Sequence, residues 1–275
     1  MSRSSPPTSD FSKVKQQQKD AWESGDLGMF SKTIVLVSEL LCEAVDLRSN
    51  QKVLDVAAGT GNTAIAAARR WCDVTAVDFV QGLLEQARRR AEVEAFSISV
   101  AQGDAENLPF KDSSFDVVLS TFGSMFAPNQ ERTAVELLRV CRPGGKVGMT
   151  NFPPDSFAGE FFRAMARHAP PPRGIKPSVL WGLEDRLHDL FGAGASSIDL
   201  RRRTFFFRYA SPQHWLDVFR TYFGPVRSAF QTLDTARAER LSTQLLNVVG
   251  HFNQATDGTV VAPCDYVEIV VLKRT

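Results

Sequence analysis

The chain has 275 residues, of which 43% are hydrophobic and 23% charged, and its formal net charge is +1. These values are typical of a globular protein with a sizeable core, and they exclude a strong field that would draw the chain to nucleic acid or a membrane surface. We therefore expect neither as a partner. The four cysteines form no C-x-x-C pair and no cluster with histidine at metal-ligand spacing, so we predict reduced thiols, no metal and a cytoplasmic protein.

The first 48 residues divide into a tail and a helical segment. Residues 1–12 are expected to be disordered, and their Ser/Pro-rich start lacks the apolar run of a signal peptide. Residues 13–48 are predicted to form an N-terminal helical cap, because a broad apolar face recurs at helical spacing between Ile34 and Val45.

Residues 49–150 alternate between short apolar strands and helices, which indicates a parallel sheet covered on both faces. In such sheets a ligand binds at the carboxyl ends of the strands. We predict that this region is a cofactor-binding core. The expected strands are 53–57, 74–77, 97–101, 115–120 and 145–150, and the expected helices are 63–71, 80–92 and 129–141.

Residues 151–275 are expected to complete the sheet and to govern specificity. Helices are predicted near 157–168 and 182–191, and strands at 197–209 and 265–272. Ser211 and Pro212 are typical of an N-cap and first helical position, so a helical insertion begins there. About fifty residues, 210–260, separate the last two strands, and we predict that they form a lid over the substrate.

The turn after the first strand predicts a nucleotide-like ligand. Gly59 and Gly61 let the backbone approach a ligand closely, and the helix that follows presents its N-terminus. The turn also fits the dinucleotide pattern G-x-G-x-x-A, with Asp78 about 20 residues later, so a nicotinamide-dependent oxidoreductase is one reading. Asp55 argues against it, because a carboxylate at this strand end would repel a pyrophosphate and attract an ammonium and sulfonium.

Three further segments follow this turn in order along the chain. They are 74–78, a β-branched strand that ends in an acid; 103–106, Gly-Asp-Ala-Glu; and 137–146, a helix end followed by Arg-Pro-Gly-Gly-Lys. With them, the chain closely resembles the class I S-adenosylmethionine-dependent methyltransferases, in particular the small-molecule group (type 11) that includes quinone-biosynthesis and natural-product enzymes. The resemblance is strong over residues 20–150 and weaker beyond.

The resemblance implies a fold, a cofactor and a set of contacts. The fold is a Rossmann-like, doubly wound seven-stranded α/β sheet, mostly parallel with the last strand antiparallel, and the N-terminal segment helps to close the site. S-adenosylmethionine would leave as S-adenosylhomocysteine. Asp55 would hold the methionine ammonium, Asp78 the ribose hydroxyls and Asp104 the adenine amino group. The implied cofactor-binding residues are Asp55, Ala57, Gly59, Gly61, Asp78, Phe79, Leu83, Gly103, Asp104, Ala105 and Thr121.

The acceptor side is less defined, because methyl transfer from a sulfonium needs positioning and water exclusion more than a fixed catalytic motif. His168, His251 and Tyr222 are candidates for a base or an orienting group, although an ordinary packing or surface role is the simpler interpretation of each. The aromatic content of 10% is compatible with an apolar acceptor pocket, although aromatic clusters more often form ordinary core. Its candidate residues are Trp22, Phe30, Phe122, Trp181, Tyr222 and Phe223.

The predicted function is methyl transfer to an oxygen, nitrogen or carbon atom of a small molecule. Two alternatives stay open: a non-catalytic cofactor-binding protein of the same fold, and the oxidoreductase. Methylation of an exocyclic amine in nucleic acid is disfavoured, because the segment after the fourth strand reads Ser120-Thr121-Phe122-Gly123 and lacks an N-P-P-Y motif. The sequence determines neither the acceptor nor the oligomeric state.

Overall fold

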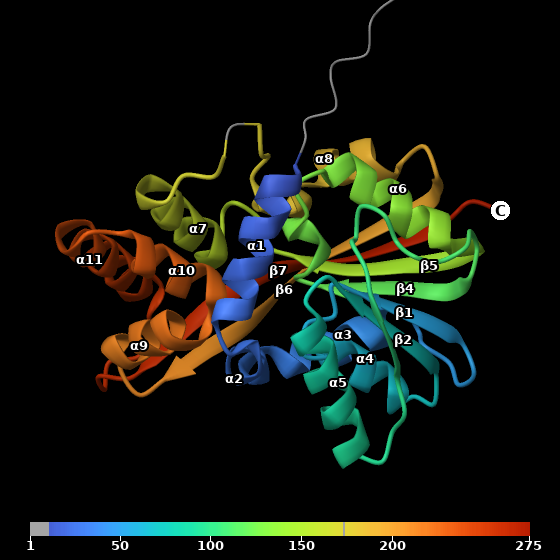
Figure 1. Cartoon of the computed structure of the whole chain (residues 1–275), viewed down its shortest axis with the longest axis horizontal. Helices are drawn as coiled ribbons and strands as arrows, with labels where there is room; N and C mark the ends of the chain where they lie inside the picture. Colours follow the sequence, from blue (N-terminus) through green and yellow to red (C-terminus); the bar gives the residue numbers. More distant parts are fainter. Residues whose placement is uncertain (1–10, 173) are drawn as a thin grey trace, which may run out of the picture.

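The computed structural model of the chain describes residues 11–172 and 174–275. Residues 1–10 of the expected tail lie outside this part. A seven-stranded sheet forms the centre of the molecule, in the order β3-β2-β1-β4-β5-β7-β6 (Figure 1). The strands are β1 (Lys52–Val56), β2 (Asp73–Asp78), β3 (Ser99–Gln102), β4 (Phe115–Thr121), β5 (Cys141–Asn151), β6 (Ala195–Tyr209) and β7 (Val260–Lys273).

The pairing of the strands confirms the predicted α/β class. The first five strands are mutually parallel, and β7 runs antiparallel to both β5 and β6. The helices are α1 (Ser12–Ser24), α2 (Leu27–Ser31), α3 (Val35–Ala44), α4 (Asn62–Ala68), α5 (Gln81–Val93), α6 (Gln130–Val140), α7 (Phe157–His168), α8 (Glu184–Phe191), α9 (Pro212–Tyr222), α10 (Gly224–Thr232) and α11 (Thr235–Phe252), with short 3₁₀ helices η1 (Lys32–Ile34), η2 (Ser124–Phe126) and η3 (Ser178–Gly182).

Two hydrophobic clusters lie on opposite faces of the sheet. One contains the apolar sides of α3, α4 and α5, and the other contains those of α6, α7 and α8. Adjacent residues of one strand therefore enter different clusters: Val53 packs in the first and Leu54 in the second, and both are fully buried. This alternation follows from the period of two in a β-strand.

Strands β5 and β7 begin earlier than the sequence indicates. We expected them at 145–150 and 265–272, but they start at Cys141 and Val260. In β5 the reason is a register shift, because Cys141 pairs with Phe115 whereas Lys146 already pairs with Val117. The Arg-Pro-Gly-Gly segment, residues 142–145, thus lies within an irregular strand.

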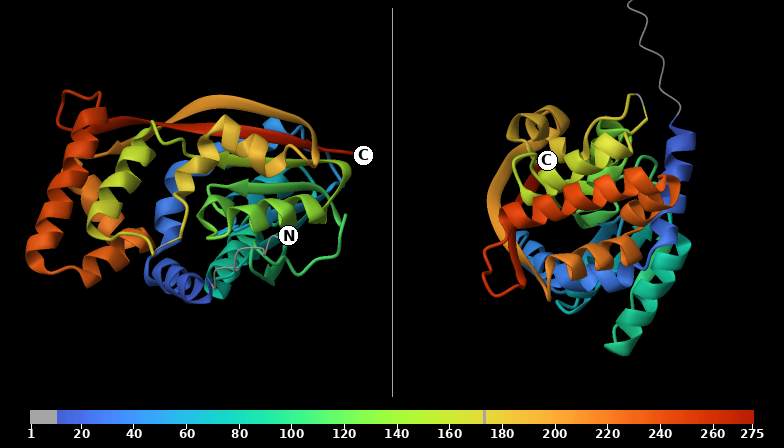
Figure 2. Two further views of the ribbon diagram at one scale, coloured as in Figure 1. Left: turned by 90° about the horizontal axis from the view of Figure 1, so that it is seen from above. Right: turned by 90° about the vertical axis from the view of Figure 1, so that its left-hand side faces the viewer.

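The long strands β6 and β7 pair along 14 residues of β7 and carry α9, α10 and α11 beyond the end of the sheet (Figures 1 and 2). This confirms the helical insertion between the last two strands. Ser211 caps α9 by accepting a hydrogen bond from the backbone N of His214, with Pro212 in the first turn, as the sequence predicts.

The N-terminal helix α1 packs against α10 of this insertion. Gly25 and Gly224 make the close approach possible: a Cβ on Gly224 would lie 2.1 Å from the carbonyl oxygen of Ala21. The N-terminal and C-terminal segments therefore meet on one side of the sheet (Figure 1). The division into cap, core and lid as separate units stays a prediction.

Candidate active site

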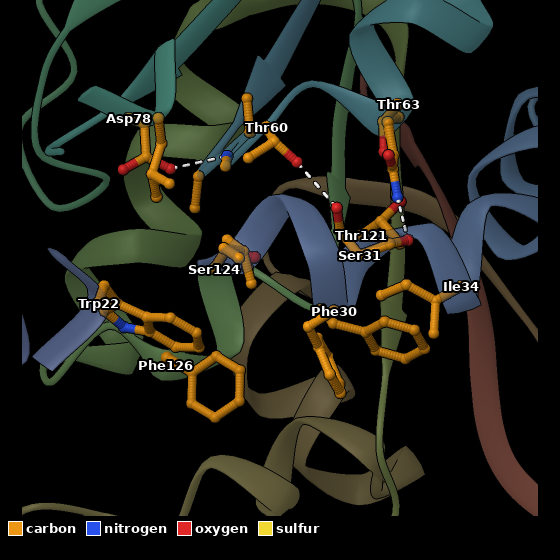
Figure 3. A pocket seen from close by; sticks show the side chains of 18 of the residues that line it. Trp22, Phe30, Ser31, Ile34, Thr60, Thr63, Asp78, Thr121, Ser124 and Phe126 are labelled. Carbon is orange, nitrogen blue, oxygen red and sulfur yellow. Dashed lines mark hydrogen bonds between the residues drawn. The ribbon is translucent and has the colours of Figure 1, made fainter. Parts of the chain in front are cut away.

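A cavity lies at the carboxyl ends of β1, β2 and β4, where the parallel topology brings loops from distant parts of the chain together (Figure 3). Helices α1 and α2 complete one wall. The eleven residues assigned to cofactor binding by the resemblance come together here except for Gly61. The ten that line the cavity are Asp55, Ala57, Gly59, Asp78, Phe79, Leu83, Gly103, Asp104, Ala105 and Thr121.

The glycine loop, residues 57–61, has a backbone that side chains would hinder. Gly59 and Gly61 have φ angles of 54° and 83°, in the left-handed region that glycine adopts without strain. Gly61 does not line the cavity. It lets the loop pack on α5, because a Cβ at this position would lie 2.7 Å from the Cβ of Ala87. The loop delivers the chain to the N-terminus of α4.

Asp55 lies beneath this loop at the end of β1. Its side chain is only 2% exposed, and its Oδ2 accepts a hydrogen bond from the backbone N of Ala64 at 2.8 Å. Burial raises the pKa of Asp55 to about 8, an effect that the Ala64 bond opposes and the nearby charge of Asp78 reinforces. A buried carboxyl whose desolvation is offset by so few hydrogen bonds is suited to bind a cationic group.

The free energy of unfolding of the ligand-free protein is expected to fall as the pH rises from about 4 to about 8, and above about pH 6, where folded Asp78 is largely ionised, the fall comes chiefly from Asp55. A raised pKa means that folded Asp55 keeps a proton that the unfolded chain has released. The stability from this proton is complete below the ordinary pKa of about 4 and is lost as the pH rises through about 8, with a slope of at most ~1.4 kcal/mol per pH unit. Urea denaturation at several pH values measures it.

Asp55→Asn should remove this slope above about pH 6, because an amide does not titrate. Asp73→Asn, on the exposed start of β2, should keep it. Equal slopes in the wild type and the Asp55 variant would mean that Asp55 ionises in its usual range.

Asp78 fixes the glycine loop from the neighbouring strand. Its Oδ2 accepts from the backbone N of Gly59 at 2.8 Å, and its Oδ1 accepts from Val80 at 2.9 Å. Burial raises the pKa of Asp78 to about 6, although these backbone bonds favour the charged form. Near pH 7 the side chain is therefore largely a carboxylate that faces the cavity.

Asp104 has a partner that the sequence did not reveal. Lys15 of α1 contacts the Oδ2 of Asp104 at 2.6 Å and the Oε2 of Glu106 at 2.5 Å, and these carboxylates raise the pKa of Lys15 against the opposing effect of its partial burial. Gln18 adds a hydrogen bond from its Nε2 to the carbonyl oxygen of Phe126. Helix α1 is thereby attached to two loops at the rim of the cavity.

A row of polar side chains links α2 and α3 to the glycine loop. Ser31 and Thr60 share a hydrogen bond of 2.8 Å (Figure 3). The Oγ1 of Thr63 is hydrogen-bonded to the Oγ of Ser38 at 3.0 Å and to the Oγ1 of Thr121 at 2.8 Å. Of these residues, only Thr121 is among those that the resemblance assigns to cofactor binding. Arg90 of α5 also reaches the loop and donates to the carbonyl oxygen of Thr60. Neither α2 nor α5 carries a motif that would have indicated these contacts.

The other side of the cavity is an aromatic chamber. Four of the predicted acceptor residues line it: Trp22, Phe30, Phe122 and Phe223. Phe122 has a φ of 54°, unusual for a bulky residue, and its ring stacks on Phe152 with centroids 4.0 Å apart. We define the aromatic chamber by its rings: Trp22, Phe30, Phe122, Phe126, Phe152, Phe157, Phe161, Phe162, Phe205, Phe207, Phe219 and Phe223.

Two predicted acceptor residues lie elsewhere. Trp181 is fully buried in the core beside Phe191 and does not line the cavity, because η3 turns its ring toward α8. Tyr222 also lies outside the cavity; at its position the chain turns from α9 into α10. The pocket assignments of these two residues were wrong.

The candidate bases also lie outside the cavity. His168 ends α7, and His251 is exposed on α11. Neither histidine lines the cavity, and Tyr222 does not either. Within residues 11–172 and 174–275 there is also no group of three or more His, Cys, Asp and Glu side chains that could hold a metal ion. No helix in these ranges is long and apolar enough to cross a bilayer.

Acidic strand ends, a glycine loop and this sheet order together define a Rossmann-like nucleotide-cofactor fold of the methyltransferase type. A family model described as a methyltransferase domain matches residues 53–145. The chain is 36% identical over 230 residues to the uncharacterized protein Rv1403c of Mycobacterium tuberculosis, which covers 82% of this chain and 84% of the relative. It is 39% identical over 113 residues to a demethylmenaquinone methyltransferase of Paenarthrobacter aurescens, which covers 41% and 43% of the two chains.

A solved structure gives the same fold. The phosphoethanolamine N-methyltransferase 2 of Haemonchus contortus, in complex with phosphomonomethylethanolamine and S-adenosylhomocysteine, matches with a TM-score of 0.59 at 16% identity, over 97% of this chain and 60% of the other. The chain belongs to the class I S-adenosylmethionine-dependent methyltransferases.

Proposed function

We propose that the protein transfers the methyl group of S-adenosylmethionine to an oxygen, nitrogen or carbon atom of a small-molecule acceptor. One observation carries this proposal: a single cavity joins the buried carboxyls Asp55 and Asp78 to the aromatic chamber. The first part has the charge for a cationic nucleoside, and the second has the apolar surface for a separate substrate. Methyl transfer requires that the cofactor site and the acceptor site adjoin each other.

The buried polar atoms of the cavity fit the cationic end of this cofactor. Asp55 is a carboxyl with a single backbone hydrogen bond. Asn62 donates from its Nδ2 to the carbonyl oxygen of Ser31, whereas its Oδ1 is buried without a partner. Both groups line the cavity and are hydrogen-bond acceptors, so together they suit the methionine ammonium.

Bound S-adenosylmethionine supplies a methyl group that is already activated by the sulfonium charge. The side chains of the protein therefore have to orient the cofactor and the acceptor, enclose them and exclude water. Asp78 would hold the ribose, since an ionised carboxylate can accept from hydroxyl groups beyond its bonds to Gly59 and Val80. Asp104 would accept from the adenine amino group, in competition with Lys15. The aromatic chamber would keep water from the transferred methyl.

The charges at the site disfavour the oxidoreductase alternative. A dinucleotide would place its pyrophosphate near Asp55, and two cations at the loops of the cavity are already engaged. Arg90 binds the carbonyl oxygen of Thr60, and Lys15 binds Asp104 and Glu106. The non-catalytic alternative does not account for an apolar chamber that adjoins the cofactor residues.

Isothermal titration with S-adenosylmethionine and, separately, with NAD tests the cofactor. We expect micromolar binding of S-adenosylmethionine and none of NAD. Transfer of a labelled methyl group to small-molecule acceptors then tests catalysis. Binding of NAD alone would establish the oxidoreductase, and binding of S-adenosylmethionine without transfer to any acceptor would favour the non-catalytic protein.

A further inference from the structure

We propose that the acceptor is an uncharged, largely apolar ring compound whose hydrogen-bonding group is held by the hydroxyl of Ser124. This inference rests on the proposed function and adds the chemical class of the acceptor. It depends on three features of the cavity: the position of its charges, the packing of its aromatic rings and one buried hydroxyl without a partner.

The charges of the cavity all lie on the cofactor side. Among the residues that the structure describes, four side chains of ionisable acids and bases line its cofactor side: Lys15, Asp55, Asp78 and Asp104. Lys15 is neutralised by Asp104 and Glu106. The chamber itself contributes Cys264, whose thiol stays neutral because burial raises its pKa. A phosphate, carboxylate or ammonium on the acceptor would lose its water here and gain no counter-charge.

The packing of the rings does not form a cage for a cation. A cation binds where several ring faces point at one place. Here most pairs of neighbouring rings meet edge to face or at a tilt, although Phe122 and Phe152 stack. Phe161 meets Phe162 at an interplanar angle of 75° and Phe219 at 65°, and Phe30 meets Phe219 at 84°. The chamber thus presents a mixed surface of ring edges and faces, which suits a neutral ring that packs by dispersion and edge-to-face contacts.

Ser124 is the polar exception in this apolar half. It lies in η2, directly after β4, and is 1% exposed. Its backbone N donates to the Oγ of Ser120 at 2.9 Å, which fixes its position, whereas its own Oγ is buried without a hydrogen-bond partner. Buried hydroxyls are nearly always paired, so an unpaired one at a cavity wall indicates a partner that is brought by a ligand.

The other hydroxyl side chains that line the cavity are already paired. Ser31 bonds with Thr60, and Thr63 bonds with Ser38 and Thr121. Ser124 also lies with Trp22 and Phe126 among the side chains that face the cavity (Figure 3). A hydroxyl, carbonyl or amine on the acceptor ring that bonds to Ser124 would give the ring one defined orientation.

Three probes of equal ring size test the class of acceptor. Wild-type protein saturated with S-adenosylhomocysteine is titrated at neutral pH with 2-naphthol, 2-naphthoate and 2-naphthylmethylammonium. We expect 2-naphthol to bind at least about tenfold more tightly than either charged probe. Equal or tighter binding of a charged probe, or no binding of 2-naphthol at about 1 mM, would overturn the proposal.

Ser124→Ala tests the polar contact. We expect it to weaken binding of 2-naphthol about fivefold and to leave binding of naphthalene unchanged, because naphthalene has no group to pair. Ser114→Ala, whose hydroxyl bonds to Lys111 outside the cavity, should alter neither. Equal losses for both probes would refute the role of Ser124. If Ser124→Ala does not fold, the affinities of the wild-type protein for 2-naphthol and for naphthalene still measure the contact. Equal affinities for the two probes would refute it.

The binding of S-adenosylhomocysteine separates the proposed acceptor class from the proposed function on which it rests. Absence of S-adenosylhomocysteine binding would overturn the proposed function, whereas the same probes titrated without it would still measure the charge preference of the chamber. Binding of S-adenosylhomocysteine together with tighter binding of charged probes would overturn only the acceptor class.

Discussion

Asp78→Ala is expected to abolish measurable binding of S-adenosylmethionine. The carboxylate lies at the cavity, where it would accept from both ribose hydroxyls, and each such charge-assisted bond contributes about 1.5–3 kcal/mol. The substitution also removes the acceptor for the backbone N of Gly59 and Val80, so the glycine loop loses its link to β2. The combined loss corresponds to at least about a hundredfold in affinity, measured by isothermal titration.

Asp78→Asn separates these two effects. The amide retains one oxygen as an acceptor for a backbone N, but it brings a donor and no charge to the ribose. Its cofactor affinity should therefore fall nearly as far as that of the alanine variant, while its thermal stability stays closer to the wild type. Asp73→Ala, on the exposed start of the same strand, is the matched control and should change neither. Unchanged affinity in both Asp78 variants would contradict the ribose assignment.

Gly61→Ala is expected to destabilise the protein by about 4 kcal/mol. A left-handed φ costs a non-glycine residue ~1–3 kcal/mol, and the new Cβ would lie 2.7 Å from the Cβ of Ala87, which adds ~1–3 kcal/mol of overpacking. Against a typical total of about 5–15 kcal/mol this is a large fraction. The measurement is the free energy of unfolding in urea.

Gly82→Ala provides the matched control, because a Cβ there meets nothing within 4 Å and the residue lies in α5. Alanine favours a helix over glycine by up to ~1 kcal/mol, so this variant should be as stable as the wild type or more so. If Gly61→Ala were equally stable, the loop would have to adopt another backbone at Gly61, and its contact with α5 would not be needed for folding.

The local parts of the fold could be predicted because each depends on a short stretch of sequence. The apolar run before Gly59 and the alanine-rich run after it define β1 and α4, and the glycines permit the turn between them. Ser211 and Pro212 mark the start of α9 by the hydrogen-bonding and φ preferences of those two residue types. Such signals act over a few residues and do not depend on the rest of the chain.

The aromatic residues show the opposite case. Trp22 and Trp181 are both large rings near predicted helices, and both were assigned to the acceptor pocket. Trp22 lines the cavity with Phe126 and Phe223, whereas Trp181 is buried against Phe191. Periodicity predicts that a ring is buried but not which neighbour covers it, because that depends on how whole elements pack.

The polar contacts of the site have the same limit. Lys15 and Asp104 are 89 positions apart, and Ser124 shows its unpaired hydroxyl only once the surrounding backbone is placed. No residue type or spacing distinguishes Ser124 from the other serines of the chain. Histidine is a candidate base by residue type alone, but His168 and His251 lie outside the cavity.

The sequence by itself determined the class of protein, the order of strands and helices, and the acids and glycine loop at the carboxyl ends of the strands, since these depend on local backbone preferences and on charge at strand ends. Only the tertiary structure decided which rings form the aromatic chamber, where Lys15 attaches α1, and that Ser124 is unpaired. These features arise from contacts between residues far apart in the chain, whose free energies depend on the relative placement of whole elements rather than on any local pattern.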